Sequence, residues 1–257
     1  MTWKKFVKLS EHYYSQYQRG CFRREGWSGM PDSTKRGEKG RVRRVVAEAA
    51  EGESGGPDEM TYEMWQEAPE TMRELLWRSV NSVLEGRQLP EEWTGSFTKL
   101  LVKKAGSEGA LEDFRPVCLM STAAQIITGI WAHRLSTTLE ERGVLEDVQE
   151  GFRPDRSTKR QVLRLLNCIN DAKRNEKKLI VAFLDFENYF NAIGLECWFE
   201  ILEKFGMAKE DVRVLRQYYE HSYFQVVQES GEATARITLQ RGLRQGCPLS
   251  PILGEWS

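Results

Sequence analysis

One acidic side chain stands directly after an apolar run and could do chemistry. Leu179 to Leu184 offers no polar face, and Asp185 follows it. Period-two alternation in such a run predicts a strand that is covered on both sides. A carboxylate at the end of a buried strand needs a partner, a hydrogen bond or a bound cation. The alternative is an Asp that caps the following helix or marks the turn, and the spacing alone favours neither interpretation.

Composition limits where any further chemistry can lie. Lys and Arg number 37 and Asp and Glu number 38, which leaves a formal net charge of -1. No global field therefore draws the chain to nucleic acid or to an acidic membrane, and any basic site must be local. The five Cys residues are odd in number and form no Cys-x-x-Cys pair. They fit a reducing compartment better than a disulfide or zinc framework.

The chain shows no targeting or spanning segment, so we expect a cytoplasmic or nuclear protein. The N-terminus lacks the apolar stretch of a secretory signal, and no run approaches the roughly 20 apolar residues that span a bilayer. An aromatic amphipathic helix is expected at the start. Residues 20–56 are rich in glycine and carry a basic cluster, which is more typical of a mobile, solvated segment than of a phosphate site.

The elements that must position Asp185 follow from residue 56 onward, and they predict an α/β fold. Helical spacing predicts two helices over 60–84 that are interrupted near Pro69, and strand patterns occur at 97–102 and 114–119. Ser121 or Thr122 caps a long helix that ends at Gly143. Ser157 caps another, with an apolar face expected to point inward. Two helices over 198–219 and a hairpin over 224–240 follow the central strand, and a glycine-containing loop leads into a last helix.

Several separate strings then fall into one pattern. In order, they resemble the fingers and palm of a reverse transcriptase of the non-long-terminal-repeat (LINE-type) retrotransposons, from about Gly55 to Leu253. The strings are GGPDEMTYE, LPEEW, KLLVKKAG, FRPVCLMSTAAQII, RLSTTLE, QEGFRPDRSTKRQ, FLDFENYF and RGLRQGCPLSPIL. The resemblance implies an RNA-directed DNA polymerase that uses an RNA template, a DNA primer and deoxynucleoside triphosphates (dNTP). It implies a partial palm-and-fingers fold with an antiparallel palm sheet flanked by helices.

The resemblance also implies the site residues. Asp185 matches the first catalytic Asp and would bind Mg²⁺, because two metal ions about 3.5 to 4 Å apart stabilise the attacking and leaving oxygens in nucleotidyl transfer. Residues that match nucleotide-binding positions are Lys104, Arg115, Phe190, Gln245 and Gly246. Phe190 corresponds to the aromatic position that blocks a ribose 2′-hydroxyl. Arg153 and Arg156 could follow template phosphate, although a simple helix-entry turn explains them equally well.

The departures from the family pattern shape the expected activity. Asn188, Tyr189 and Asn191 replace the usual Lys, Ala and Asp, and Tyr189 threatens space that the sugar needs. The sequence ends before any Tyr/Phe-x-Asp-Asp hairpin, so the second carboxylate pair and the thumb are expected to be absent. We therefore expect a truncated enzyme that is inactive alone. The alternatives are a non-catalytic remnant with weak RNA or nucleotide binding, or a chain with no biochemical role.

This interpretation divides the chain into three parts. Residues 1–54 form an N-terminal extension, residues 55–178 the fingers with the fingers and palm helices, and residues 179–257 a partial palm. No membrane partner is expected. Without the missing hairpin, the apolar strand around 180–184 would present an unpaired edge, which predicts non-specific self-association.

Overall fold

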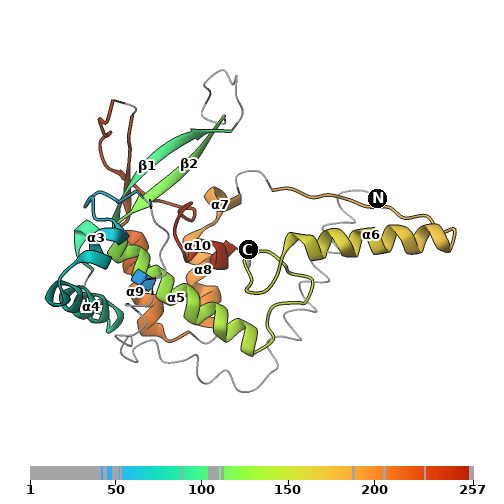
Figure 1. Cartoon of the computed structure of the whole chain (residues 1–257), viewed down its shortest axis with the longest axis horizontal. Coiled ribbons are helices and arrows are strands. Elements are labelled where there is room, and N and C mark those ends of the chain that lie inside the picture. The colour runs from blue at the N-terminus through green and yellow to red at the C-terminus, as the bar shows by residue number, and fades with distance from the viewer. Residues whose placement is uncertain are drawn as a thin grey trace.

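The structure, a computed structural model, contains one four-stranded sheet beside a group of packed helices (Figure 1). The helices are α3 (Tyr62–Glu67), α4 (Glu70–Leu84), the 3-10 turn η1 (Glu91–Trp93), α5 (Thr122–Glu141), α6 (Thr158–Arg174), α7 (Tyr189–Ala192), α8 (Leu195–Lys204), α9 (Lys209–Glu220) and α10 (Ser250–Gly254). The strands are β1 (Gly95–Val102), β2 (Phe114–Met120), β3 (Tyr223–Val226) and β4 (Ile237–Thr238). The residues described are 42, 45–47, 52, 54–87, 89–103, 110, 113–186, 189–204, 207–228 and 230–254.

The sheet is mixed, which corrects the expectation of an antiparallel sheet. Its strand order is β2-β1-β3-β4. β1 pairs antiparallel with β2, with Ser96 opposite Met120, and β3 pairs antiparallel with β4. β1 and β3 are parallel, with Gly95 opposite Tyr223. Helices α5 to α9 lie between β1 and β3 in the chain, and a long helical connection of this kind lets a strand return in the same direction.

The two strands predicted from the sequence before residue 120 are confirmed, and β2 is an edge strand. Edge positions tolerate proline because one side of the strand needs no ladder donor, and Pro116 lies opposite Leu100 in β2. The first half of β1 is mostly buried, while residues 99–102 are exposed. The far end of the β1–β2 hairpin therefore projects from the body, as Figure 1 shows.

Helix α5 is the centre of the core. Ser121 caps it as predicted, because its Oγ accepts a hydrogen bond from the Ala124 amide at 3.2 Å. The helix ends before Gly143, which has a left-handed φ of +60°. Twelve of its residues are buried, among them Trp131 and Leu139. Full burial of one such side chain contributes about 1.5–3 kcal/mol, so Leu139→Ala should cost about 2–5 kcal/mol.

Helices α4 and α9 complete this core. α4 begins after Pro69, as the sequence predicted, and buries Leu76, Val80, Val83 and Leu84. α9 buries a face that includes Leu215 and the two adjacent rings of Tyr218 and Tyr219. Within the described ranges, none of the helices combines the length and the apolar composition that crossing a bilayer requires.

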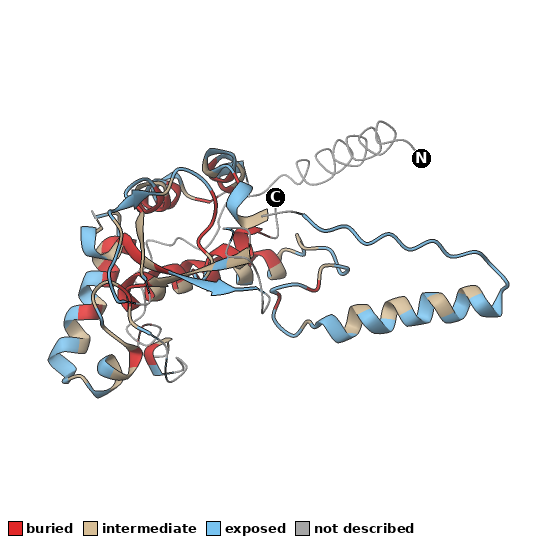
Figure 2. Cartoon of the chain, turned by 90° about the horizontal axis from the view of Figure 1, so that it is seen from above, coloured by how far each residue is buried: buried red, intermediate tan, exposed pale blue. Residues whose placement is uncertain are grey.

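Helix α6 and the residues after it differ most from the sequence prediction. α6 projects from the body and has no buried residue, so the expectation that its apolar face points inward was wrong (Figures 1 and 2). Val162 is 52% exposed and Leu166 is 48% exposed. Residues 179–186 return toward the body in an extended form (Figure 2), but they join no strand, and Ile180 is 92% exposed. The predicted buried strand is therefore absent, because no described segment pairs with it or covers it.

Candidate functional site

Residues from several elements of the fold line one cavity of about 580 Å³. Arg115 comes from β2, Asp185 from the exposed return segment, Phe190 from α7, and Gln245 from the loop before α10. The cavity is lined by Arg115, Phe152, Leu184, Asp185, Phe186, Tyr189, Phe190, Arg244, Gln245, Ser250 and Pro251. The structure thus brings together four of the residues that the sequence resemblance had placed around a nucleotide.

Phe190 is held by the loop before α10. The Leu243 amide donates a hydrogen bond to the Phe190 carbonyl at 2.7 Å, and the Gly242 amide donates to the Ile193 carbonyl at 2.9 Å. Gly254 in α10 lies so close that a Cβ there would be 2.7 Å from the Phe190 ring. The short helix α7 is therefore fixed from two sides, and Phe190 forms a stable wall of the cavity.

Gln245 and Gly246 lie against the edge strand β2. The Cys118 amide donates a hydrogen bond to the Gln245 carbonyl at 2.8 Å, so the loop uses a ladder position that strand β2 leaves open. Gly246 has φ +115°, and a Cβ there would lie 2.6 Å from the Cys118 carbonyl oxygen. Only glycine allows both the conformation and this close approach, which places the loop backbone at the cavity.

Arg244 anchors the same loop, and sequence reasoning gave it no role. Its side chain is buried at 3% exposure and donates to the Thr94 carbonyl at 2.6 Å and to the Tyr218 hydroxyl at 3.2 Å. Its guanidinium also lies 5.3 Å from the centre of the Tyr218 ring. Burial raises the pKa of Tyr218, which keeps that hydroxyl neutral as an acceptor for Arg244. Nothing in the local pattern distinguishes a buried arginine from an exposed one.

Arg153 and Arg156, which were possible template contacts, both pair with carboxylates. The Arg153 side chain is 5% exposed and binds both carboxylate oxygens of Glu140, at 2.7 and 2.6 Å. Arg153 thereby holds the pKa of Glu140 below its ordinary value. Arg156 donates to Asp147 at 2.6 Å and is 18% exposed. A phosphate contact by either residue stays a prediction.

Tyr189 occupies the position that the sequence comparison marked as a departure. Its hydroxyl donates a hydrogen bond to the Gly254 carbonyl, and its ring centre lies 5.5 Å from that of Phe190. Phe186 and Phe152 add two further aromatic side chains to the lining. Tyr189 therefore adds an aromatic ring to the cavity wall where the family pattern has an alanine.

Among the described residues of the cavity lining, Asp185 is the one carboxylate. In the described part of the chain, no group of three or more His, Cys, Asp or Glu side chains could hold a metal ion. The described residues therefore include one carboxylate that could bind Mg²⁺, and they do not complete a two-metal centre. Lys104, the other predicted phosphate-binding residue, lies outside the residues that the structure describes.

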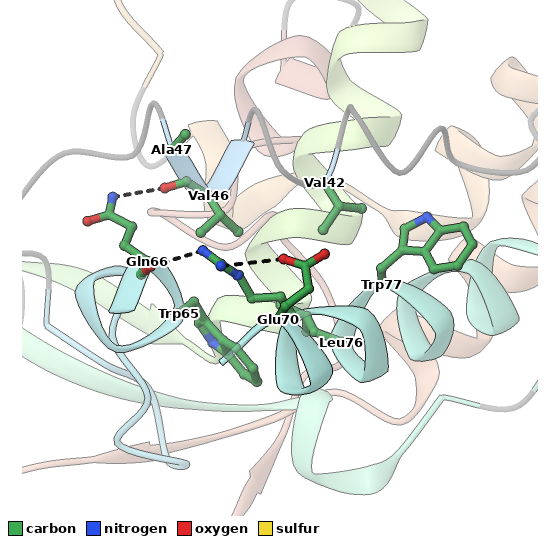
Figure 3. A pocket seen from close by; sticks show the side chains of 9 residues that line it. Val42, Val46, Ala47, Trp65, Gln66, Glu70, Leu76 and Trp77 are labelled. Carbon is green, nitrogen blue, oxygen red and sulfur yellow. Dashed lines mark hydrogen bonds and ion pairs between the residues drawn. The ribbon is translucent and has the colours of Figure 1, made fainter. Parts of the chain in front are cut away.

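A second cavity, of about 420 Å³, lies between α3, α4 and the residues Val42, Val46 and Ala47 (Figure 3). Its lining includes Val42, Val46, Trp65 and Trp77, and the Gln66 amide donates to the Val46 carbonyl at 2.9 Å. Glu70 lies within 3.4 Å of Arg73, so the charged groups at this cavity pair with each other. This second cavity contains none of the predicted site residues.

Comparison with known proteins shows which family the chain is similar to. Residues 102–255 match the family described as reverse transcriptase (RNA-dependent DNA polymerase). A probable RNA-directed DNA polymerase from transposon BS of Drosophila melanogaster is 28% identical over 184 residues, covering 71% of this chain and 20% of that protein. The Pol polyprotein from the type-1 retrotransposable element R2 of Nasonia vitripennis is 28% identical over 208 residues, covering 80% and 19%.

A third relative, the RNA-directed DNA polymerase from mobile element jockey of Drosophila melanogaster, is 22% identical over 215 residues, covering 82% of this chain and 23% of that protein. The chain thus spans about a fifth of the length of the curated relatives that it matches. The family match extends over more than half of the chain and includes all four residues that meet at the cavity. As its motifs predicted, the chain belongs to the reverse transcriptase (RNA-dependent DNA polymerase) family, and its relatives are retrotransposon proteins.

Proposed function

We propose that this chain forms the nucleotide-binding part of an RNA-directed DNA polymerase, which adds dNTP to a DNA primer along an RNA template. The observation that carries the proposal is the convergence of Arg115, Asp185, Phe190 and Gln245 on one cavity. These residues come from four separate segments, and each has a chemical character that one part of a nucleotide requires.

Each side chain suits a different part of the ligand. Arg115 is exposed, and its planar fork can hold a triphosphate oxygen pair. Phe190 offers a fixed ring edge that would meet the 2′ position of a sugar. Gln245 and the exposed backbone of Gly246 would lie along the nucleotide and the templating base. Lys104, outside the described residues, keeps its predicted contact with the triphosphate.

Mg²⁺ belongs to the same proposal. Asp185 would hold one ion, and a bound ion would neutralise the charge of the triphosphate and polarise the reacting phosphoryl group. The other ligands must come from outside the described residues. We therefore expect the isolated chain to bind dNTP in the presence of Mg²⁺ but to extend no primer. Template-dependent extension that Asp185→Ala abolishes would contradict this expectation.

A direct test measures nucleotide affinity. The chain is titrated with fluorescently labelled dATP and Mg²⁺, and Arg115→Gln is compared with Arg78→Gln. Arg78 is an arginine of α4 whose side chain is 69% exposed and which does not line the cavity. A charge-assisted hydrogen bond contributes about 1.5–3 kcal/mol, so Arg115→Gln should weaken binding about 10- to 100-fold, and Arg78→Gln should leave it unchanged. Equal affinities of the two variants would refute the proposal.

A second measurement tests the sugar contact. The affinity for dATP is divided by the affinity for ATP, first for the wild type and then for Phe190→Val. A smaller side chain should admit the 2′-hydroxyl and lower this ratio, while dATP itself should bind almost as before. An unchanged ratio would show that Phe190 does not discriminate between deoxyribose and ribose.

RNA binding without catalysis is the second candidate function, favoured by the single carboxylate among the described residues that line the cavity. With a formal net charge of -1, the chain should bind RNA weakly through local basic residues, and its affinity should fall steeply with salt. Tight binding that does not respond to salt would contradict this candidate.

A further inference from the structure

Phe152 combines two unfavourable features at the rim of the cavity. Its φ is +50°, a left-handed conformation that is an outlier for a bulky residue. Its side chain is nevertheless 64% exposed, so burial does not offset the strain. Glycine would remove the strain at this position. Strained residues of this kind cluster at functional sites, where the surrounding structure holds them in place.

The turn around Phe152 is built rigidly. The Arg153 guanidinium is fixed by both Glu140 oxygens and also donates to the carbonyls of Glu146, at 2.6 Å, and Gln149, at 3.1 Å. The Ser157 amide donates to the buried Glu150 carboxylate at 3.2 Å. The backbone on both sides of Phe152 is therefore anchored. These contacts explain why the strained conformation persists.

The ring faces the cavity that holds the predicted nucleotide site. Phe152 lines this cavity together with Asp185 and Gln245. Its centre lies 6.5 Å from that of Phe190, and the two ring planes are inclined by 82°. An edge-to-face pair fixes the orientation of both rings and leaves most of Phe152 open to solvent. An exposed aromatic ring in a cavity that Arg115 also lines suits a ligand with a planar base and an anionic phosphate.

We propose that Phe152 is a stacking platform for a nucleobase at the mouth of this cavity. Aromatic stacking tolerates every base, because each base has a π-face. The base can belong to the bound nucleotide or to an unpaired residue of an RNA strand. The location of the platform rests on the proposed function, since the cavity is the predicted nucleotide site. The chemistry of the platform rests on the Phe152 side chain alone.

The test uses the full chain and two probes that contain 2-aminopurine, a base whose fluorescence is quenched when it stacks on an aromatic ring. One probe is the 2-aminopurine deoxyribonucleoside triphosphate with Mg²⁺. The other is a single-stranded RNA of about ten nucleotides with one 2-aminopurine, a length within the range that single-strand sites accept. An RNA with an abasic site at that position is the ligand control.

The variants separate the ring from the backbone. Phe152→Gly removes the ring and relieves the strain, so its thermal midpoint should equal or exceed that of the wild type. Its affinity for at least one quenched probe should fall roughly 5- to 100-fold, the range that loss of one stacking aromatic produces. Phe152→Tyr keeps the ring and should bind within about twofold of the wild type. Asp155→Gly, at another left-handed position with φ +57°, is the matched control and should not weaken binding.

The outcomes separate the two proposals. Loss of quenching with the triphosphate identifies the bound nucleotide as the source of the base, and loss with the RNA identifies an unpaired strand residue. Binding of both probes by Phe152→Gly as tightly as by the wild type overturns the platform and leaves the proposed function intact. An equal loss of affinity for the abasic RNA overturns it as well. RNA stacking without any nucleotide binding would support the platform and refute the nucleotide site.

Discussion

Gly246→Ala provides a sharp test of how the loop is held at the cavity. At φ +115° an L residue is strained, and left-handed conformations cost about 1–2 kcal/mol. The new Cβ would also lie 2.6 Å from the Cys118 carbonyl oxygen, so the loop must move away from β2. Movement would weaken the hydrogen bond from the Cys118 amide to Gln245, which contributes about 0.5–1.5 kcal/mol. Together these terms predict a loss of about 1.5–3.5 kcal/mol in the free energy of unfolding.

Gly231→Ala is the matched control. Gly231 has φ +87° but no atom within 4 Å of an added Cβ, so this substitution should cost only the conformational part, about 1–2 kcal/mol. Urea unfolding followed by tryptophan fluorescence gives both values at an unchanged slope. Gly246→Ala should also weaken dATP binding, whereas Gly231→Ala should not. A Gly246→Ala variant that is as stable as Gly231→Ala would refute the close approach of the loop to β2.

Three further predictions follow from the described contacts. Arg153 lowers the pKa of Glu140 in the folded state. This pair should therefore stabilise the fold above the unfolded pKa of about 4.3 and lose that effect as pH falls toward the lowered value. Glu140→Gln should flatten the acid limb of a curve of unfolding free energy against pH. Arg244→Met should cost about 2–4 kcal/mol in urea unfolding and weaken dATP binding, since the Thr94 carbonyl and the Tyr218 hydroxyl both lose their charged donor. Unchanged stability would show that Arg244 is no anchor. Phe183→Lys should increase the monomer fraction in sedimentation at micromolar concentration, because Phe183 is 85% exposed on an apolar segment. An unchanged monomer fraction would show that this segment does not cause self-association.

Local signals in the sequence predicted the elements near the core. Ser121 at the start of α5, Gly143 after its end and Pro69 before α4 act through their own backbone conformation and hydrogen bonds. Such effects do not depend on distant partners, so they can be read before the fold is known. The hairpin of β3 and β4 was confirmed for the same reason, with Gly231 in the left-handed conformation between its strands.

The apolar run at 179–184 was wrongly predicted to be a buried strand. An apolar run predicts burial only if other segments cover it, and in the described chain none does. The prediction for helix α6 fails in the same way, since its apolar side chains keep the predicted period but none of them is buried. Arg153 and Arg244 show what local signals leave out. The sequence offered a template contact or a helix-entry turn for Arg153 and no role for Arg244, and only tertiary contacts show that both are buried.

The segments that line the cavity are held by the rest of the fold to different degrees. Gln245 and Gly246 are tied to β2 and, through Arg244, to Thr94 just before β1 and to α9. The turn that carries Phe152 is tied to α5 through Arg153 and Glu140. Asp185 instead ends an extended segment that no described strand pairs with. The loop and the turn that line the proposed nucleotide site are therefore preorganised, whereas the position of Asp185, the proposed metal ligand, depends on a segment that would cover residues 179–184. It follows that a partner segment would raise Mg²⁺ affinity by fixing Asp185 without changing the contacts of Gln245, because preorganisation lowers the ordering cost of binding.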